Sequence, residues 1–116
     1  MDESDSTPAF KTRVLEVLDS IPEGRVMTYG GLAVAAGKPG NARQVGDLLR
    51  GLSSATDFPW QRVINSQGRI STYKVGTGEL QRALLESEGI AFNDSGRCDL
   101  GRLNWFPGKD DTAPSG

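Results

Sequence analysis

Residues 59–64 place a large aromatic ring, an amide and a guanidinium directly before a short apolar run, as Pro59-Trp60-Gln61-Arg62-Val63-Ile64. Proline fixes its own φ angle and holds the preceding residue extended, so Trp60 is expected at a defined position rather than in an irregular loop. An indole ring cannot form a nucleophilic thiolate, and the amide of Gln61 has no titratable proton. The stretch is therefore unsuited to nucleophilic or acid–base catalysis.

Other candidates for reactive or metal-binding side chains are few. Cys98 is the only cysteine and the chain has no histidine, which excludes an intrachain disulfide and argues against a zinc site. Cys98 lies far from residues 59–64 and is expected to be a small, partly buried apolar residue. No metal and no other cofactor are expected.

The charges are unevenly placed along the 116 residues. The formal net charge is −2, but residues 25–82 hold eight Lys or Arg against three Asp or Glu, and acidic residues gather near both ends. A basic middle is compatible with a DNA-binding face, although an ordinary solvated surface would explain the charges equally well. The acidic start is unlike a secretory signal, and no apolar run approaches the roughly 20 residues that cross a bilayer. A cytoplasmic location is expected, nucleoid-associated in a bacterium or nuclear in a eukaryote.

The chain length suits a single domain, expected over residues 8–107 between disordered tails at 1–7 and 108–116. Apolar residues at helical spacing predict a helix over 8–20. Thr28 is expected to cap a helix that runs to about residue 36, and Asn41 to cap another that runs to about 52. A last helix is predicted over 78–88. The apolar positions on which the first and third of these helices depend are Phe10, Val14, Val17, Leu18, Ile21, Ala42, Val45, Leu48, Leu49 and Leu52.

The two helices over 28–52 are joined by a glycine-containing turn, a helix-turn-helix pattern in which the later helix reads DNA. Residues 62–65 and 69–72 flank Ser66-Gln67-Gly68 and predict a small hairpin or wing. Residues 90–103 are expected to form turns with at most a short strand, and 105–107 an aromatic anchor. No internal repeat is apparent. The predicted fold is mainly α with a small β hairpin, a winged helix-turn-helix.

Several motifs, in order along the chain, resemble the DNA-binding domain of O6-alkylguanine-DNA alkyltransferases. They are residues 21–33 (Ile-Pro-Glu-Gly-Arg-Val-Met-Thr-Tyr-Gly-Gly-Leu-Ala), Ala42-Arg43-Gln44-Val45-Gly46, Pro59-x-x-Arg62-Val63-Ile64, Ser66-x-Gly68 and Leu84-Leu85-Glu86-x-Glu88-Gly89. The enzymes carry Pro-Cys-His-Arg-Val, whose cysteine takes the alkyl group and whose histidine helps to activate it. Trp60 and Gln61 stand at those two positions here. Tryptophan for cysteine is the mark of the alkyltransferase-like proteins, which bind alkylated guanine without repairing it.

The resemblance also implies roles for individual residues. Arg43 matches an arginine finger that fills the gap left by a flipped base, and Tyr29 matches a tyrosine that pushes the neighbouring phosphate. Asn65 matches an asparagine that stabilises a turn. Contacts with DNA are thereby implied for Thr28, Tyr29, Arg43 and Gln44, and an alkylguanine pocket for Tyr29, Trp60, Arg62, Val63, Ser71, Tyr73 and Lys74. From the residues alone, each has a structural alternative: a surface arginine for Arg43, a packed ring for Tyr29, a core ring for Trp60, and a salt bridge for Arg62.

The resemblance implies a protein that is not an enzyme. It would bind double-stranded DNA containing O6-alkylguanine, flip that base from the minor groove, and mark the lesion for nucleotide excision repair proteins. A monomer is expected. Replacing cysteine by tryptophan adds volume, so the pocket is expected to be wider and to accept bulkier O6 adducts. The alternatives are a winged-helix transcription regulator, a residual alkyltransferase or glycosylase, and a protein-interaction module that has lost DNA binding.

Overall fold

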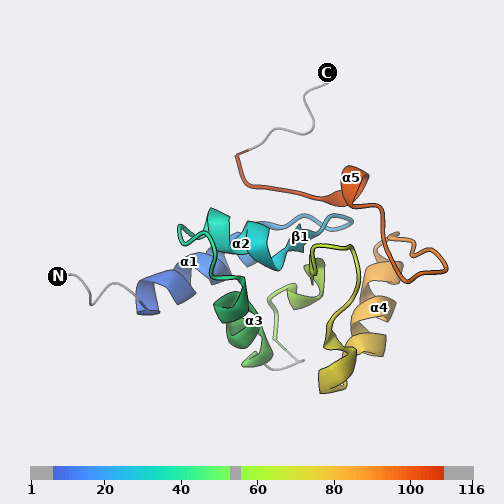
Figure 1. Ribbon diagram of the computed structural model, residues 1–116, viewed down its shortest axis with the longest axis horizontal. Coiled ribbons are helices and arrows are strands. Elements are labelled where there is room, and N and C mark those ends of the chain that lie inside the picture. Colours follow the sequence, from blue (N-terminus) through green and yellow to red (C-terminus); the bar gives the residue numbers. More distant parts are fainter. Residues whose placement is uncertain (1–6, 53–55, 109–116) are drawn as a thin grey trace.

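The computed structural model describes residues 7–52 and 56–108, and for residues 7–9 and 74 the backbone alone (Figure 1). The chain folds mainly into helices, as expected, with a very small sheet. In chain order the elements are α1 (Thr7–Ser20), β1 (Met27–Thr28), α2 (Tyr29–Ala35), α3 (Ala42–Arg50), the 3-10 turn η2 (Trp60–Arg62), β2 (Val63–Ile64), the 3-10 turn η3 (Thr72–Val75), α4 (Gly78–Ser87) and α5 (Leu100–Leu103). Residues 1–6 and 109–116, expected as tails, lie outside the described residues.

The helix-turn-helix prediction is confirmed by α2 and α3, which pack against each other. Thr28 caps α2 as predicted, because its hydroxyl accepts a hydrogen bond from the amide of Gly31 at 2.9 Å. Asn41 occupies the N-cap position of α3 but makes no side-chain bond to the helix backbone. Its amide nitrogen instead donates to Oε1 of Gln44 at 2.8 Å, so the predicted capping role of Asn41 is wrong.

The predicted hairpin across residues 66–68 is also wrong. The two strands of the described sheet are β1 and β2, which pair in parallel with Met27 opposite Val63 and Thr28 opposite Ile64. The physical reason is burial on both faces: alternate residues of a strand point to opposite sides. Val63 packs into one apolar cluster and Ile64 into a second one, and neither is exposed. A solvent-facing wing could not bury both side chains.

The sheet thus forms the wall between two apolar clusters. The first gathers residues of α1 and α2 with Met27, Val45 and Val63. The second joins Val26, Ile64 and Cys98 to residues of α4 and the segment that follows it. Cys98 is buried at 7% exposure, which confirms the expectation of a small buried apolar residue.

The segment after α4 differs from the expectation of turns and a short strand, because it contains the short helix α5. The carboxylate of Asp99 caps this helix at the amide of Arg102. The backbone then bonds to Val26 on both sides, from Val26 N to Leu103 O at 3.0 Å and from Trp105 N to Val26 O at 2.7 Å. Trp105 and Phe106 pack on the first cluster and confirm the predicted aromatic anchor. Within the described ranges, no helix is both long and apolar enough to cross a membrane.

Candidate nucleic-acid interface

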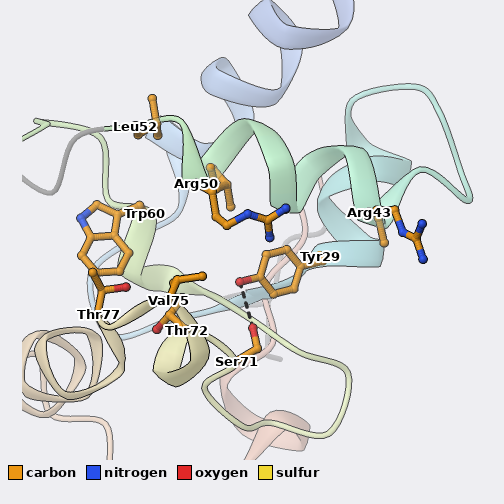
Figure 2. Close-up of a pocket in the computed structure, with 12 residues that line it drawn as sticks. Tyr29, Arg43, Arg50, Leu52, Trp60, Ser71, Thr72, Val75 and Thr77 are labelled. Carbon is orange, nitrogen blue, oxygen red and sulfur yellow. Dashed lines mark hydrogen bonds between the residues drawn. The ribbon is translucent and has the colours of Figure 1, made fainter.

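A cavity of about 540 Å³ opens between α3 on one side and η2 and η3 on the other (Figure 2). Binding sites for small molecules usually have volumes of roughly 300–1,000 Å³, so the cavity is large enough for a nucleobase. Its wall combines apolar side chains with hydroxyls and two arginines. The lining residues are Tyr29, Ala42, Arg43, Gly46, Leu49, Arg50, Leu52, Trp60, Ser71, Thr72, Val75 and Thr77.

Trp60 forms one end of this cavity (Figure 2). The ring is held by the turn expected from Pro59: the amide of Trp60 donates to the carbonyl of Phe58 at 2.8 Å, and the amide of Arg62 to the carbonyl of Pro59 at 3.0 Å. Phe58 packs against the first apolar cluster and so ties this turn to the core. The indole itself is only half-buried. Trp60 is therefore a wall residue with a face toward the cavity rather than a core tryptophan.

Tyr29 and Ser71 meet at the opposite end of the cavity. Their hydroxyl oxygens are 3.2 Å apart and share a hydrogen bond (Figure 2). Tyr29 is the first residue of α2, and Ser71 is the residue directly before η3. The Tyr29 ring also packs against the first cluster. Tyr29 therefore packs against the core with its ring and also lines the cavity.

Two arginines of α3 are among the lining residues, and in Figure 2 the Arg50 side chain lies near Tyr29 while that of Arg43 points outward. Arg43 is exposed in the first turn, where a side chain can reach away from the protein. Arg50 lies in the last turn and forms an ion pair with Asp47. A β-carbon placed on Gly46 would lie 3.8 Å from Nη1 of Arg50 and 4.0 Å from Cε1 of Tyr29, so both side chains cover this glycine. Among the described lining residues there is no carboxylate, and the cavity favours a ligand with negative charge.

The buried side-chain amide of Gln81 connects η2 and η3, the two turns on the same side of the cavity. Gln81 of α4 is 1% exposed, and its nitrogen donates to the carbonyls of Gln61 at 2.9 Å and Val63 at 2.8 Å. Its oxygen accepts from the hydroxyl of Thr72 at 2.6 Å. Both ends of the amide are therefore satisfied, as a buried polar group requires. Gln81 sets the distance between the turn that carries Trp60 and the turn that carries Thr72.

Glu88, at the end of α4, anchors the same region from the other side. Its carboxylate accepts from Nε of Arg62 at 3.0 Å, from Nε2 of Gln61 at 2.8 Å and from the amide of Gly24 at 3.1 Å. Burial alone would raise the pKa of Glu88, but the hydrogen bonds from Arg62, Gly24 and Gln61, with the Arg62 charge, together outweigh burial and lower that pKa. The carboxylate is therefore ionised and holds Gln61 and Arg62 in place.

Several residues expected in the pocket lie elsewhere. Arg62 points to Glu88 and to the carbonyl of Ile21, and Val63 is fully buried in β2, so neither lines the cavity. Tyr73 is 52% exposed and lies against Gly78, where a β-carbon would come within 2.3 Å of its ring. The side chain of Lys74 lies outside the described part.

Three further expected residues make local hydrogen bonds within the protein. Thr28 caps α2, and Gln44 accepts from Asn41. Asn65 stabilises a turn, because its side-chain oxygen accepts from the amides of Gln67 and Arg69, both at 2.9 Å. Of the expected residues, Tyr29, Arg43, Trp60 and Ser71 are the ones that the structure brings together at the cavity.

Sequence reasoning missed much of the α3 wall. Ala42, Gly46, Leu49 and Arg50 follow the i, i+4, i+7, i+8 spacing of one helical face, a signal that could have placed Arg50 beside the finger position. Nothing in the sequence pattern pointed to Thr72, Val75 and Thr77. These residues reach the cavity because the segment from η3 to the start of α4 folds back against it.

Comparisons of this chain with family models, known sequences and solved structures agree on one family. Residues 9–90 match the family described as 6-O-methylguanine DNA methyltransferase, DNA binding domain. A DNA base-flipping protein of Vibrio parahaemolyticus is 43% identical over 84% of this chain and 97% of its own, and Alkyltransferase-like protein 1 of Schizosaccharomyces pombe is 45% identical over 84% and 95%. A crystal structure of S. pombe Atl1 in complex with damaged DNA containing O6-carboxymethylguanine covers 92% of this chain and 98% of its own, with a TM-score of 0.75 and 39% identity. The chain belongs to the O6-methylguanine-DNA methyltransferase family, as one of its alkyltransferase-like proteins.

Proposed function

We propose that this protein binds duplex DNA containing O6-alkylguanine, flips the modified base into the cavity, and holds it there unrepaired. The observation that carries the proposal is the position of Trp60, in the wall of the cavity and at the place where the alkyltransferases have their cysteine. The relatives named for base flipping, and the Atl1 complex with damaged DNA, support the same function.

The energetics of flipping are compatible with the side chains present. Extruding a base costs a few kcal/mol, and contact with an aromatic ring returns about 1–3 kcal/mol. Trp60 supplies such a ring. Arg43, exposed in the first turn of α3, would enter the base stack and hydrogen-bond the orphaned base. Tyr29 would contact the adjacent phosphate through its hydroxyl.

Transfer of the alkyl group to the protein is not expected, because none of the described residues that line the cavity carries a thiol. Cys98 is the only thiol of the chain; it packs in the second cluster and does not line the cavity. Its burial raises the pKa of the thiol, which keeps it protonated and unreactive at neutral pH. The protein would therefore act as a damage sensor rather than an enzyme, and the bound lesion would be passed to nucleotide excision repair proteins.

The test compares two duplexes of one sequence, one with a single O6-methylguanine and one without, at one fixed salt concentration. Tighter binding to the modified duplex is expected. After long incubation, mass spectrometry should find the methyl group still on the DNA and the protein mass unchanged. Equal affinity for the two duplexes would refute lesion sensing, and methyl transfer to protein or release of free base would refute the non-enzymatic function.

A further inference from the structure

A five-residue pattern occurs twice in the chain, as Asn65-Ser66-Gln67-Gly68-Arg69 and as Asn93-Asp94-Ser95-Gly96-Arg97. Asparagine, glycine and arginine recur at the same spacing, 28 positions apart, while the residues between them differ. The first copy directly follows β2, and the second lies between α4 and α5. We call them the twin turns.

The twin turns have the same hydrogen bonds. In each, the asparagine oxygen accepts two backbone amides, at 2.9 and 2.9 Å for Asn65 and at 2.8 and 3.0 Å for Asn93. In each, the backbone N–H of the asparagine donates to the backbone carbonyl of the arginine, at 3.1 and 2.9 Å. Gly68 and Gly96 both have a positive φ, 79° and 78°, a conformation that glycine adopts without strain. The two turns are therefore one local structure built twice.

The twin turns are joined so that their arginines stand opposite each other. Arg69 and Arg97 form an antiparallel β-bridge, and the amide of Cys98 donates to the carbonyl of Gly68 at 2.9 Å. A β-carbon on Gly68 would come within 2.9 Å of the Cys98 carbonyl, so the close approach requires glycine there. Side chains opposite each other in an antiparallel pair lie on the same face, with β-carbons roughly 4.5–5.5 Å apart.

Two like charges in this position repel each other, which destabilises the pairing. Both arginines are exposed, and no carboxylate among the described residues forms an ion pair with either. Three other arginines of the described part, Arg50, Arg62 and Arg82, do have carboxylate partners. An anion held between the two guanidinium groups would stabilise this arrangement.

The arginine pair lies close along the chain to the cavity. Arg69 and Ser71 are exposed on either side of the buried Ile70, which places them on one face of this segment. Ser71 lines the cavity and bonds to Tyr29. The face that carries Tyr29 and Ser71 therefore continues to Arg69, and across the bridge to Arg97.

We propose that the twin turns form a second DNA-binding site, in which Arg69 and Arg97 hold backbone phosphates of the duplex beside the lesion. This inference rests on the proposed function, since it requires DNA at the cavity. The site would contact the DNA backbone and not the edges of the bases. It contributes affinity that does not depend on the lesion, as phosphate contacts do.

The test measures binding of the full chain to plain and O6-methylguanine duplexes between roughly 50 and 200 mM salt. Arg69→Ala and Arg97→Ala should each reduce the steepness of log Kd against log salt by about 0.9, and the double variant by about 1.8. The ratio of affinities for the two duplexes should stay as in the wild type. Lys11→Ala removes an exposed cation of α1 and serves as the control, with an unchanged slope.

Folding of the variants is checked by thermal unfolding, where loss of like-charge repulsion should leave the midpoint of the double variant at or above that of the wild type. Arg69→Lys with Arg97→Lys keeps both charges and should retain the salt slope. Unchanged slope and affinity in the double alanine variant would overturn the second site, as would a loss confined to the lesion duplex. A wild type without lesion preference but with the expected slopes would instead refute the proposed function and leave the second site standing.

Discussion

Tyr29 and Ser71 bring the first residue of α2 to the residue before η3 through one hydrogen bond of 3.2 Å between their hydroxyls. The bond crosses an end of the cavity, and both side chains line it (Figure 2). The phenol of Tyr29 has a single O–H, so if Tyr29 donates it to a DNA phosphate, it can no longer donate it to Ser71. With Tyr29 as its donor, the bond is a contact of the unbound protein that competes with DNA.

This competition predicts opposite effects from two small substitutions. Tyr29→Phe should weaken binding to the O6-methylguanine duplex about fivefold, because a hydrogen bond is worth about 1 kcal/mol. Ser71→Ala removes the same bond from the unbound protein but keeps the Tyr29 hydroxyl, so affinity should be unchanged or higher. Titrations by fluorescence anisotropy give both values. Equal losses in the two variants would show that the bond supports the bound state instead.

Gln81 should control the shape of the cavity, because its amide joins η2 to η3. Gln81→Leu leaves the carbonyls of Gln61 and Val63 without their side-chain donor, at a cost of about 1–3 kcal/mol for each group left unpaired. Preference for the lesion duplex over the plain duplex should also fall. Both are measured, by denaturant unfolding and by paired titrations.

A matched control separates these two effects of Gln81. Val14→Ala removes buried apolar volume from α1, away from the cavity lining, and also destabilises the fold. At a temperature where both variants are folded, Val14→Ala should keep the lesion preference of the wild type. A Gln81→Leu variant that keeps the full preference would contradict the positioning role.

Glu88 should make the stability of the fold depend on acid pH. Because its folded-state pKa lies below the ordinary value of 4.5, ionised Glu88 stabilises the fold above that value, and the contribution is lost as pH falls through the folded-state pKa. Urea unfolding of the wild type at a series of pH values should show this decline. Glu88→Gln should be less stable at neutral pH and should lose part of the slope; an identical slope in both proteins would assign the decline to other carboxylates.

Arg50 should favour adducts that carry a negative charge. It lines the cavity, and its ion-pair partner among the described residues is the exposed Asp47, in a pair worth little to stability. Arg50→Ala should therefore unfold like the wild type but bind an O6-carboxymethylguanine duplex about tenfold more weakly, with a smaller loss for O6-methylguanine. Asp47→Ala, which releases the guanidinium, should change the ratio in the other direction. Equal losses for the two adducts after Arg50→Ala would indicate a phosphate contact instead.

Helices α1 to α4 were readily predicted from the sequence because their signals are local, whereas the short α5 was not predicted. Periodic apolar residues mark α1, the Thr28 cap marks the start of α2, and glycine follows the end of α4. The pairing of β1 with β2 was not predictable in this way, since it joins Met27 to Val63 across a long stretch of chain. A short apolar run before a turn is the usual pattern of a hairpin strand. The sequence does not show that a second apolar cluster buries the other face of this run.

The residues of the cavity were likewise only partly predictable from the sequence. The family resemblance led to Trp60, Tyr29 and Ser71, which line it, but also to Arg62, whose carboxylate partner lies 26 positions away in the sequence. Nothing local distinguishes an arginine that faces a ligand from one that faces Glu88. The twin turns were overlooked for a different reason: five residues are too few to be noticed as a repeat before their hydrogen bonds are seen.

The most direct test of the central claim is the ratio of Kd values for plain and O6-methylguanine duplexes, measured for the wild type and for Trp60→Ala at one salt concentration. The wild type should prefer the lesion duplex, and Trp60→Ala should lose most of that preference while it still binds plain duplex, because stacking on the indole is worth about 1–3 kcal/mol. A Trp60→Ala variant that discriminates between the two duplexes as well as the wild type would contradict the account.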